Sequence, residues 1–179
     1  MPYLIIPLVI VIIAVIWAVS VSNSFNRDRV KIEEARSGID VALTKRHDVL
    51  TKMLDIAKGY ASHEKETLFK VIELRRGMTV SEMSRASDQM NEALKGISVV
   101  AESYPELRSS ENFRALQISV ADTEEHLQAA RRLYNSNVAS YNARLVTFPS
   151  SVIAGMKHLE RMPLFEAEES KRADVKMEF

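Results

Sequence analysis

The chain has 179 residues, in which 24 lysine and arginine residues balance 24 aspartate and glutamate residues, and it contains no cysteine. The balanced charge provides no basic field for a nucleic-acid partner, and the lack of cysteine excludes a disulfide framework, a cysteine–zinc site and a thiol nucleophile. With only five glycines and five prolines, the composition favours long helices over many short strands.

An apolar segment begins at Tyr3 and ends at Val21, with Ser20 as its one polar residue. Roughly 19 residues form about 28 Å of helix, close to the roughly 30 Å hydrocarbon core of a bilayer. Residues 1–22 are therefore predicted to be a transmembrane anchor. A cleaved signal peptide is the alternative, but the segment lacks a positive n-region and exceeds the usual apolar length of about 7 to 15 residues.

Three basic residues, Arg27, Arg29 and Lys31, follow the apolar segment, and no charged side chain precedes it. Positive charge is enriched on the cytoplasmic side of membrane segments. The sequence therefore predicts a single-pass protein of the cytoplasmic membrane whose C-terminal domain lies in the cytoplasm.

Residues 23–160 are predicted to form a helical domain. Apolar residues at helical spacing between Val30 and Tyr60 indicate that the membrane helix continues, with or without a bend at residues 22–26, into a first bundle helix that ends near Gly59.

A second helix is expected from an N-cap at Ser62 to Tyr104, because the residue before Pro105 is biased away from helical geometry. Gly77 and its β-branched neighbours interrupt the apolar pattern, so a kink or short loop is expected at residues 75–81.

A third helix is expected over residues 113–149, capped by Ser109 or Ser110. Large residues recur along it at intervals of seven, as in the seam of a coiled coil: Val120, Leu127, Tyr134, Tyr141 and Phe148. Three helices of about 50 to 60 Å with short connections predict an all-α, antiparallel up-down-up bundle.

A short fourth helix is predicted from the apolar residues Val152, Ile153, Met156 and Leu159. Residues 161–179 carry several charges and few apolar anchors, so they are predicted to form a loosely ordered tail.

A polar line accompanies the aromatic one on the third helix. It contains Gln117, Glu124 and Arg131, which are spaced by seven and so share one face. A partly buried network with first-helix residues such as Asp40 or Arg46 is the structural interpretation, and it would set the register of the bundle. A groove that recognises a peptide or a lipid headgroup is the functional alternative.

The pair Tyr134-Asn135 repeats after seven residues as Tyr141-Asn142. Buried tyrosine hydroxyls require hydrogen-bond partners, and asparagines at the edge of the seam could supply them on a neighbouring helix. This repeat is interpreted as architecture, with partner binding as the alternative.

Catalytic and metal motifs are not complete in this sequence. His63-Glu64 opens an HExxH pattern, but Thr67 stands where its second histidine is required. The other histidines are isolated in the sequence, whereas zinc needs at least three protein ligands: they are His47, His126 and His158. No cofactor, metal site or catalysis is therefore expected.

Several motifs resemble, in order and spacing, those of the LemA family. Before the third helix they are residues 40–46, Gly59-Tyr60-Ala61, His63-Glu64, Tyr104-Pro105-Glu106-Leu107, Asn112-Phe113 and Leu116-Gln117. From the third helix onward they are Thr123-Glu124, Ala130-Arg131, Tyr134-Asn135, Tyr141-Asn142, Phe148-Pro149, Ile153-Ala154, Phe165-Glu166 and Phe179. Arg36, where many members have tryptophan, and the missing proline after Val49-Leu50 depart from the pattern.

The resemblance implies a bacterial single-pass membrane protein with an N-terminal anchor and an antiparallel helical domain. It implies no common biochemical role, although some relatives are associated with specialised membranes. We expect a membrane-anchored scaffold or adaptor that binds another membrane protein or itself. A receptor for a peptide or small ligand between helices, and a membrane-shaping assembly protein, are the alternatives.

Overall fold

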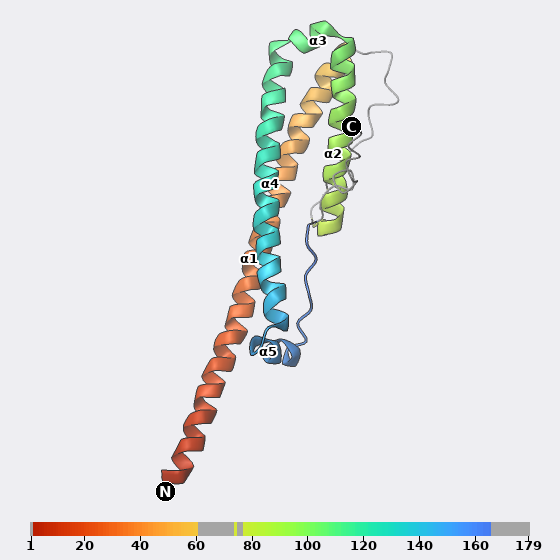
Figure 1. Cartoon of the computed structure of the whole chain (residues 1–179). Coiled ribbons are helices and arrows are strands. Elements are labelled where there is room, and N and C mark those ends of the chain that lie inside the picture. The colour runs from red at the N-terminus through yellow and green to blue at the C-terminus, as the bar shows by residue number, and fades with distance from the viewer. Residues whose placement is uncertain (1, 61–73, 75–76, 166–179) are drawn as a thin grey trace, which may run out of the picture. The chain divides into compact units, whose positions relative to one another are not determined.

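The computed structural model describes residues 2–60, 74 and 77–165 of the chain (Figure 1). These residues form α1 (Pro2–Tyr60), α2 (Val80–Ser103), α3 (Pro105–Ser109), α4 (Glu111–Val146) and α5 (Ser150–Met156). No strand occurs in these ranges, so the predicted all-α class is confirmed. The chain divides into two compact units: unit 1 is Met1–Ala35 with Leu133–Leu164, and unit 2 is Arg36–Arg132 with Phe165–Phe179.

Unit 1 pairs the first part of α1 with the last part of α4. The ring of Phe25 meets that of Tyr141 edge-on, with centroids 5.9 Å apart. The side chain of Asn137 donates to the carbonyl of Lys31 at 3.2 Å, and Arg144 pairs with Asp28. Residue numbers fall along α4 as they rise along α1, so the two helices run antiparallel. The predicted up-down-up order, which makes the first and third long helices parallel, is wrong for this pair.

The N-terminal part of α1 carries the apolar segment. An 18-residue window in it has a mean hydropathy of 2.8, and none of that window is buried within the protein. By length and composition α1 is therefore able to cross a membrane. The helix includes Pro7 and continues without interruption through residues 22–26. The predicted continuation of the apolar segment into the helical domain is confirmed.

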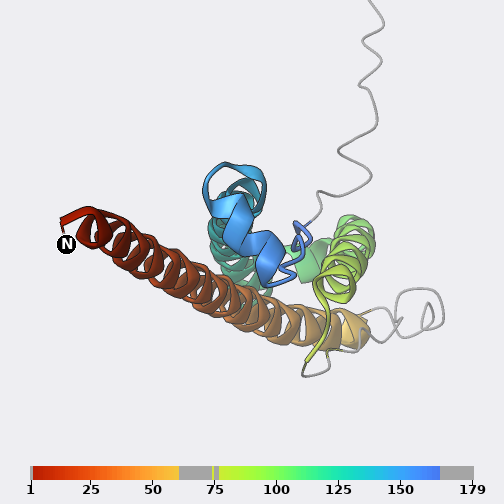
Figure 2. The same ribbon diagram turned by 90° about the horizontal axis from the view of Figure 1, so that it is seen from below.

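A short connection joins α4 to α5, and Figure 2 shows α5 lying against the end of α4. α5 confirms the predicted short fourth helix, although Leu159 lies beyond its end. α4 ends at Val146, two residues before Phe148, and the Phe148 side chain is 80% exposed. Its predicted place in the buried seam is therefore wrong, because the helical spacing that would turn it inward stops before it.

Unit 2 contains the remainder of α1, α2, α3 and the first part of α4. Its buried core draws on all four helices: Ile39, Leu43, Leu50, Met90, Ile97, Leu107, Phe113 and Leu127. On α4, the predicted seam continues as the buried Leu127, Tyr134 and Tyr141, with Val138 completing it and Val120 half-buried.

The direction of α2 differs from the predicted up-down-up order. Arg36 of α1 donates to the carbonyl of Met78, and Arg46, further along α1, donates to Ser87 and Asn91. Residue numbers thus rise together along both segments, so α1 and α2 are parallel (Figure 1). Residues 61–79 span roughly 60 Å when extended, more than the roughly 36 Å of α2, so they are long enough to permit this order.

The start of α2 is set by a capping box. The hydroxyl of Thr79 accepts from the N–H of Glu82 at 3.3 Å, and the Glu82 carboxylate accepts from the N–H of Thr79 at 2.7 Å. Gly77 precedes it with φ of 80°, a value that side-chain-bearing residues rarely adopt. The expected interruption near Gly77 is therefore confirmed. The predicted cap at Ser62 and the helical turns after it lie outside the described residues.

The connection from α2 to α4 is short, as expected. Tyr104 caps α2, with its N–H donated to the carbonyl of Val100 at 3.0 Å, and Pro105 opens the additional helix α3. Ser110 directly precedes α4 and accepts the N–H of Arg114 through its carbonyl at 3.1 Å. Because this link is short, α4 returns antiparallel to α2.

Candidate functional site

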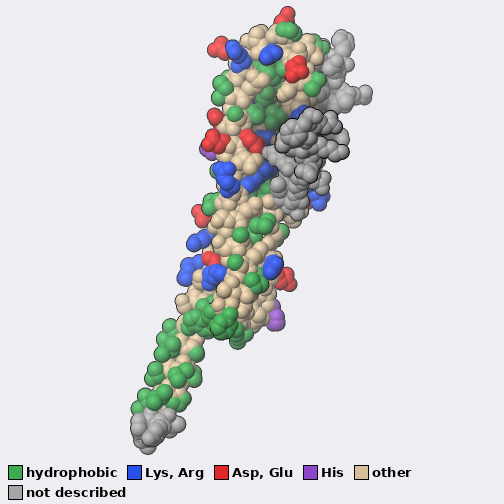
Figure 3. All heavy atoms as spheres, in the orientation of Figure 1, with side chains coloured by type: hydrophobic (Ala, Val, Ile, Leu, Met, Phe, Trp, Pro, Cys, Tyr) green, Lys and Arg blue, Asp and Glu red, His purple; other side chains and the backbone are tan. Residues whose placement is uncertain are grey.

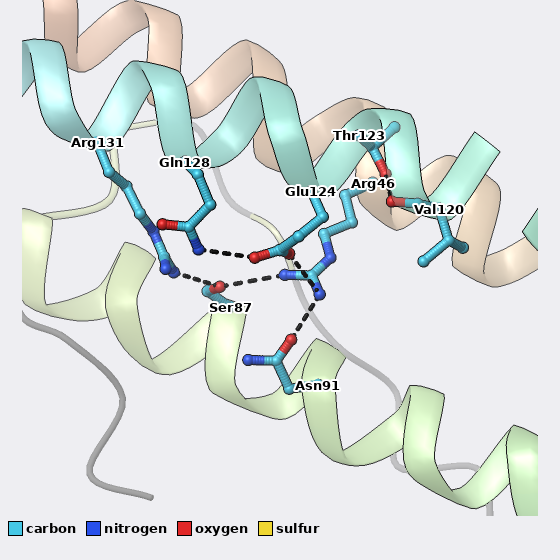
Figure 4. Close-up of polar contacts among 8 residues, drawn as sticks. All are labelled: Arg46, Ser87, Asn91, Val120, Thr123, Glu124, Gln128 and Arg131. Atoms are coloured by element: carbon cyan, nitrogen blue, oxygen red, sulfur yellow. Dashed lines mark hydrogen bonds and ion pairs between the residues drawn. The ribbon is translucent and has the colours of Figure 1, made fainter. Parts of the chain in front are cut away.

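A group of polar side chains lies in the interior of unit 2, and we call it the arginine cluster (Figure 4). Its members come from three helices: Arg46 of α1, Ser87 and Asn91 of α2, and Glu124, Gln128 and Arg131 of α4. Helical spacing explains this meeting, because residues separated by three, four or seven positions share one face of a helix.

Ser87 is the centre of the arginine cluster. Its hydroxyl accepts from Nη2 of Arg131 at 2.6 Å and from Nη1 of Arg46 at 3.4 Å. The exposed fraction is 0% for Ser87, 3% for Arg46 and 8% for Arg131. One small acceptor therefore joins two guanidinium groups that are both removed from water.

Glu124 provides the negative charge next to Arg46. Its carboxylate lies 2.9 Å from Nη2 of Arg46 and accepts from the side-chain amide of Gln128 at 2.7 Å. The same Nη2 of Arg46 donates to Asn91 at 2.5 Å. A buried charge is costly unless it is paired and hydrogen-bonded, and these contacts supply both conditions for Arg46.

Arg131 has a second neighbour of a different kind. Its guanidinium carbon lies 4.5 Å from the ring centroid of Phe165, which is itself buried. Guanidinium groups are attracted to aromatic faces within about 6 Å. The Phe165 ring therefore packs against the guanidinium group of Arg131.

The predicted polar line is brought together only in part. Glu124 pairs with Arg46, as the register interpretation expected, and Arg131 shares the Ser87 hydroxyl with Arg46, whereas Gln117 is exposed. Asp40, the other residue suggested on the first helix, accepts from the Thr44 hydroxyl through its backbone carbonyl.

Ser87 and Asn91 were not identified from the sequence. A signal for Ser87 was present, since Met83, Ser87 and Met90 have the spacing of the buried face of α2. A serine on such a face requires a hydrogen-bond partner. Nothing in the local pattern identified that partner as an arginine of another helix.

The tyrosine–asparagine repeat binds the segment that follows α5, in unit 1. The hydroxyl of Tyr134 donates to the carbonyl of Pro163 at 2.9 Å. The side-chain amide of Asn142 donates to the carbonyl of Met162 at 2.8 Å and accepts the N–H of Met162 at 2.9 Å. A backbone carbonyl of the segment after α5 is therefore one partner of the buried Tyr134 hydroxyl.

The other members of the repeat lie close by on α4. Asn135 is half-buried, and Tyr141 is buried against Phe25. Burial raises the pKa of the Tyr141 hydroxyl above its ordinary value of 10.0, with Arg29 opposing and Asp28 reinforcing the rise. The repeat thus contributes a buried edge to unit 1 and a clamp on Met162.

Potential metal ligands are dispersed in the described ranges. No group of three or more histidine, aspartate or glutamate side chains there could hold a metal ion. His47 lies 3.9 Å from Asp48, and His126 and His158 are exposed. His63-Glu64 lies outside these ranges.

Comparison with known proteins identifies the family. Protein LemA of Metamycoplasma hominis is 29% identical over 158 residues, which cover 86% of this chain and 72% of that protein. Magnetosome protein MamQ of Magnetospirillum gryphiswaldense is 25% identical over 73 residues, which cover 41% of this chain and 27% of that protein. The sequence model of the LemA family matches residues 35–179, which include the whole arginine cluster. The chain belongs to the LemA family.

Proposed function

We propose that the protein is a membrane-anchored, non-catalytic scaffold that binds another membrane protein, or a second copy of itself, through outward helix faces. One observation carries the proposal: α1 combines an apolar, unburied membrane-length segment with helical turns that belong to the core of unit 2. A domain that shares a helix with its anchor is suited to presenting a surface beside the bilayer.

The arginine cluster supports this proposal because its side chains bond to one another inside unit 2. Its donors point to Ser87, Asn91 and Glu124 inside unit 2, and this arrangement favours a register-setting role over a ligand groove. The partner-binding surface of the scaffold is therefore expected at exposed positions of unit 2. Large apolar side chains exposed on unit 2 include Val41, Val99 and Ile118.

Site-specific photocrosslinking in native membranes tests the scaffold proposal. A benzoylphenylalanine placed at Val41, Val99 or Ile118 of the full chain is expected to give a discrete adduct of defined mass from at least one position. The matched control is Glu102, an exposed polar position on α2 near Val99. If every position gives only the control's background, these faces bind no partner and the proposal is overturned for them.

A role in organising membranes is the second candidate. The observation that favours it is the similarity over 73 residues to a protein named for the magnetosome. Liposomes that receive the purified full-length protein would then change shape under electron microscopy. Unchanged vesicles at high protein density would exclude this role while leaving the scaffold proposal standing.

A further inference from the structure

α5 is apolar on both of its faces. Ile153 and Ala154 are buried, whereas Val152 is 50% exposed and Met156 is 74% exposed. Val152 and Met156 are four residues apart and so lie on the same outward face. A short helix in water normally keeps its outward face polar. α5 therefore has the composition of a helix with apolar surroundings on both sides.

Two further large apolar residues are exposed close to α5 in the sequence. They are Phe148, in the turn before α5, and Val146, at the end of α4. We call the four exposed residues Val146, Phe148, Val152 and Met156 the α4–α5 corner. No acidic residue occurs between Leu145 and Leu159. Single exposed apolar residues are ordinary on protein surfaces, whereas a contiguous group of large ones marks a contact site.

The α4–α5 corner is held at the end of the membrane segment. Nζ of Lys157, the residue after α5, donates to the hydroxyl of Ser22 at 2.6 Å. Arg144, near the end of α4, donates to the hydroxyl of Ser24 at 2.7 Å. Ser22 directly follows Val21, the last residue of the apolar segment. Figure 3 shows hydrophobic side chains gathered in unit 1 at the end of the apolar stretch of α1.

We propose that the α4–α5 corner is a second membrane contact, which inserts its four apolar side chains into the interfacial layer of the bilayer that α1 enters. This inference rests on the membrane anchor of the proposed function. The end of a membrane-spanning apolar segment is the level at which acyl chains give way to headgroups. Apolar helix faces bind there at a depth of about 5–10 Å, with basic side chains toward the headgroups.

The lipid surface is favoured over a protein partner by this continuity with the anchor. Lys157 supplies a positive charge beside the corner, and it is the only Lys, Arg, Asp or Glu residue between Leu145 and Leu159. A membrane contact at two points, one spanning and one interfacial, would fix the depth and the tilt of unit 1.

Depth-dependent fluorescence quenching tests the inference. The full chain has one tryptophan, Trp17, so Trp17→Phe removes the background and Phe148→Trp places a probe at the corner. The protein is reconstituted into vesicles whose lipids carry bromine either near the glycerol end or deep in the acyl chains. We expect the Phe148→Trp emission to shift to shorter wavelength and to be quenched most by the shallow bromines.

The matched control is Leu133→Trp in the same Trp17→Phe background. Leu133 is 57% exposed in unit 1, and it lies about 20 Å from Val146 along α4. We expect neither bromine position to quench it. Equal quenching at Leu133 and Phe148 would mean that the probe reports general adsorption to the vesicle, and it would overturn the inference.

The wild-type Trp17 separates failure of the inference from failure of the anchor. Quenching of Trp17 together with vesicle flotation reports that α1 is inserted. If Trp17 is quenched and the Phe148 probe is not, the corner lies in water and the inference is overturned, while the scaffold proposal stands. If the Phe148 probe is unquenched but shifted to shorter wavelength, and crosslinks to a second copy, the corner is a protein interface. If Trp17 itself is not quenched, both proposals fail.

Discussion

At the scale of single residues, small polar side chains satisfy hydrogen-bonding groups that come from other segments of the chain. Ser87, fully buried on α2, accepts from two guanidinium groups, and Asn142 binds both backbone groups of Met162. Such contacts contribute modestly when made, but leaving a buried donor without its acceptor is costly. Their removal should therefore produce effects larger than the size of the side chain suggests.

Replacement of Ser87 by alanine is expected to lower the free energy of unfolding by about 1–3 kcal/mol, because two buried guanidiniums lose a shared acceptor. Urea unfolding of the detergent-solubilised full chain, followed by circular dichroism, measures it. Ser98→Ala is the control, since Ser98 is an exposed serine of the same helix that bonds only its own backbone turn, and it should change stability by less than about 0.5 kcal/mol. Equal effects would contradict the central position of Ser87.

Tyr141 should make stability fall at alkaline pH. Its pKa is raised in the folded state, chiefly by burial, so the unfolded chain releases this proton first as pH increases. The stabilising contribution of the neutral hydroxyl is complete below about pH 10 and is lost as pH rises through the folded-state pKa. We expect Tyr141→Phe to flatten the decline in unfolding free energy above about pH 10. Tyr60→Phe, at an exposed position, should leave the decline unchanged.

At the scale of elements, helix ends and connections set where the helices begin, end and turn. The capping box at Thr79 begins α2, and the end of α4 at Val146 turns Phe148 outward. The clamp by Tyr134 and Asn142 holds the segment after α5 against α4. The capping box and the clamp each lead to a separate prediction.

Thr79→Ala should destabilise the protein by about 1 kcal/mol, because the N–H of Glu82 loses its side-chain acceptor. The change is measured as the free energy of unfolding in urea. Ser81→Ala, at an exposed position within the first turn of α2, provides the comparison. A Thr79 variant as stable as the Ser81 variant would show that the cap does not stabilise α2.

Asn142→Ala should free the segment after α5. The change removes two hydrogen bonds to Met162, so tryptic cleavage after the neighbouring Arg161 is expected to accelerate about fivefold or more. Mass spectrometry of the digest over time measures the rate. Ser140→Ala, at an exposed position on the same helix, should cleave at the wild-type rate, and faster cleavage of both variants would indicate general loosening of α4.

At the scale of the whole molecule, the anchor and the flanking charges predict the compartment of the domain. Arg27, Arg29 and Lys31 follow the apolar segment, and positive flanks are retained in the cytoplasm. A phosphatase fused to the C-terminus should therefore be inactive in cells, and a fluorescent protein at the same position should be bright. Replacing the three basic residues by glutamine should weaken this orientation, and an active phosphatase on the wild-type chain would reverse the assignment.

The site shows which interactions were accessible to sequence reasoning. The spacing of Glu124 and Arg131 identified one face of one helix, and Arg46 was anticipated as a partner on the first helix. Gln117 has the same spacing but is exposed. Periodicity specifies on which side of a helix a residue lies. It does not specify which positions on that side are covered by a neighbouring helix.

The amino-acid sequence by itself determined the all-α class, the membrane-length apolar segment, the family and the seam of Leu127, Tyr134 and Tyr141, because these follow from local composition and helical spacing. Only the tertiary structure decided that α2 runs parallel to α1 and that Ser87 joins two arginines. It also decided that Met162 fills the clamp of Asn142. These features depend on contacts between residues that are distant in sequence, and such contacts leave no periodic signal within any one helix.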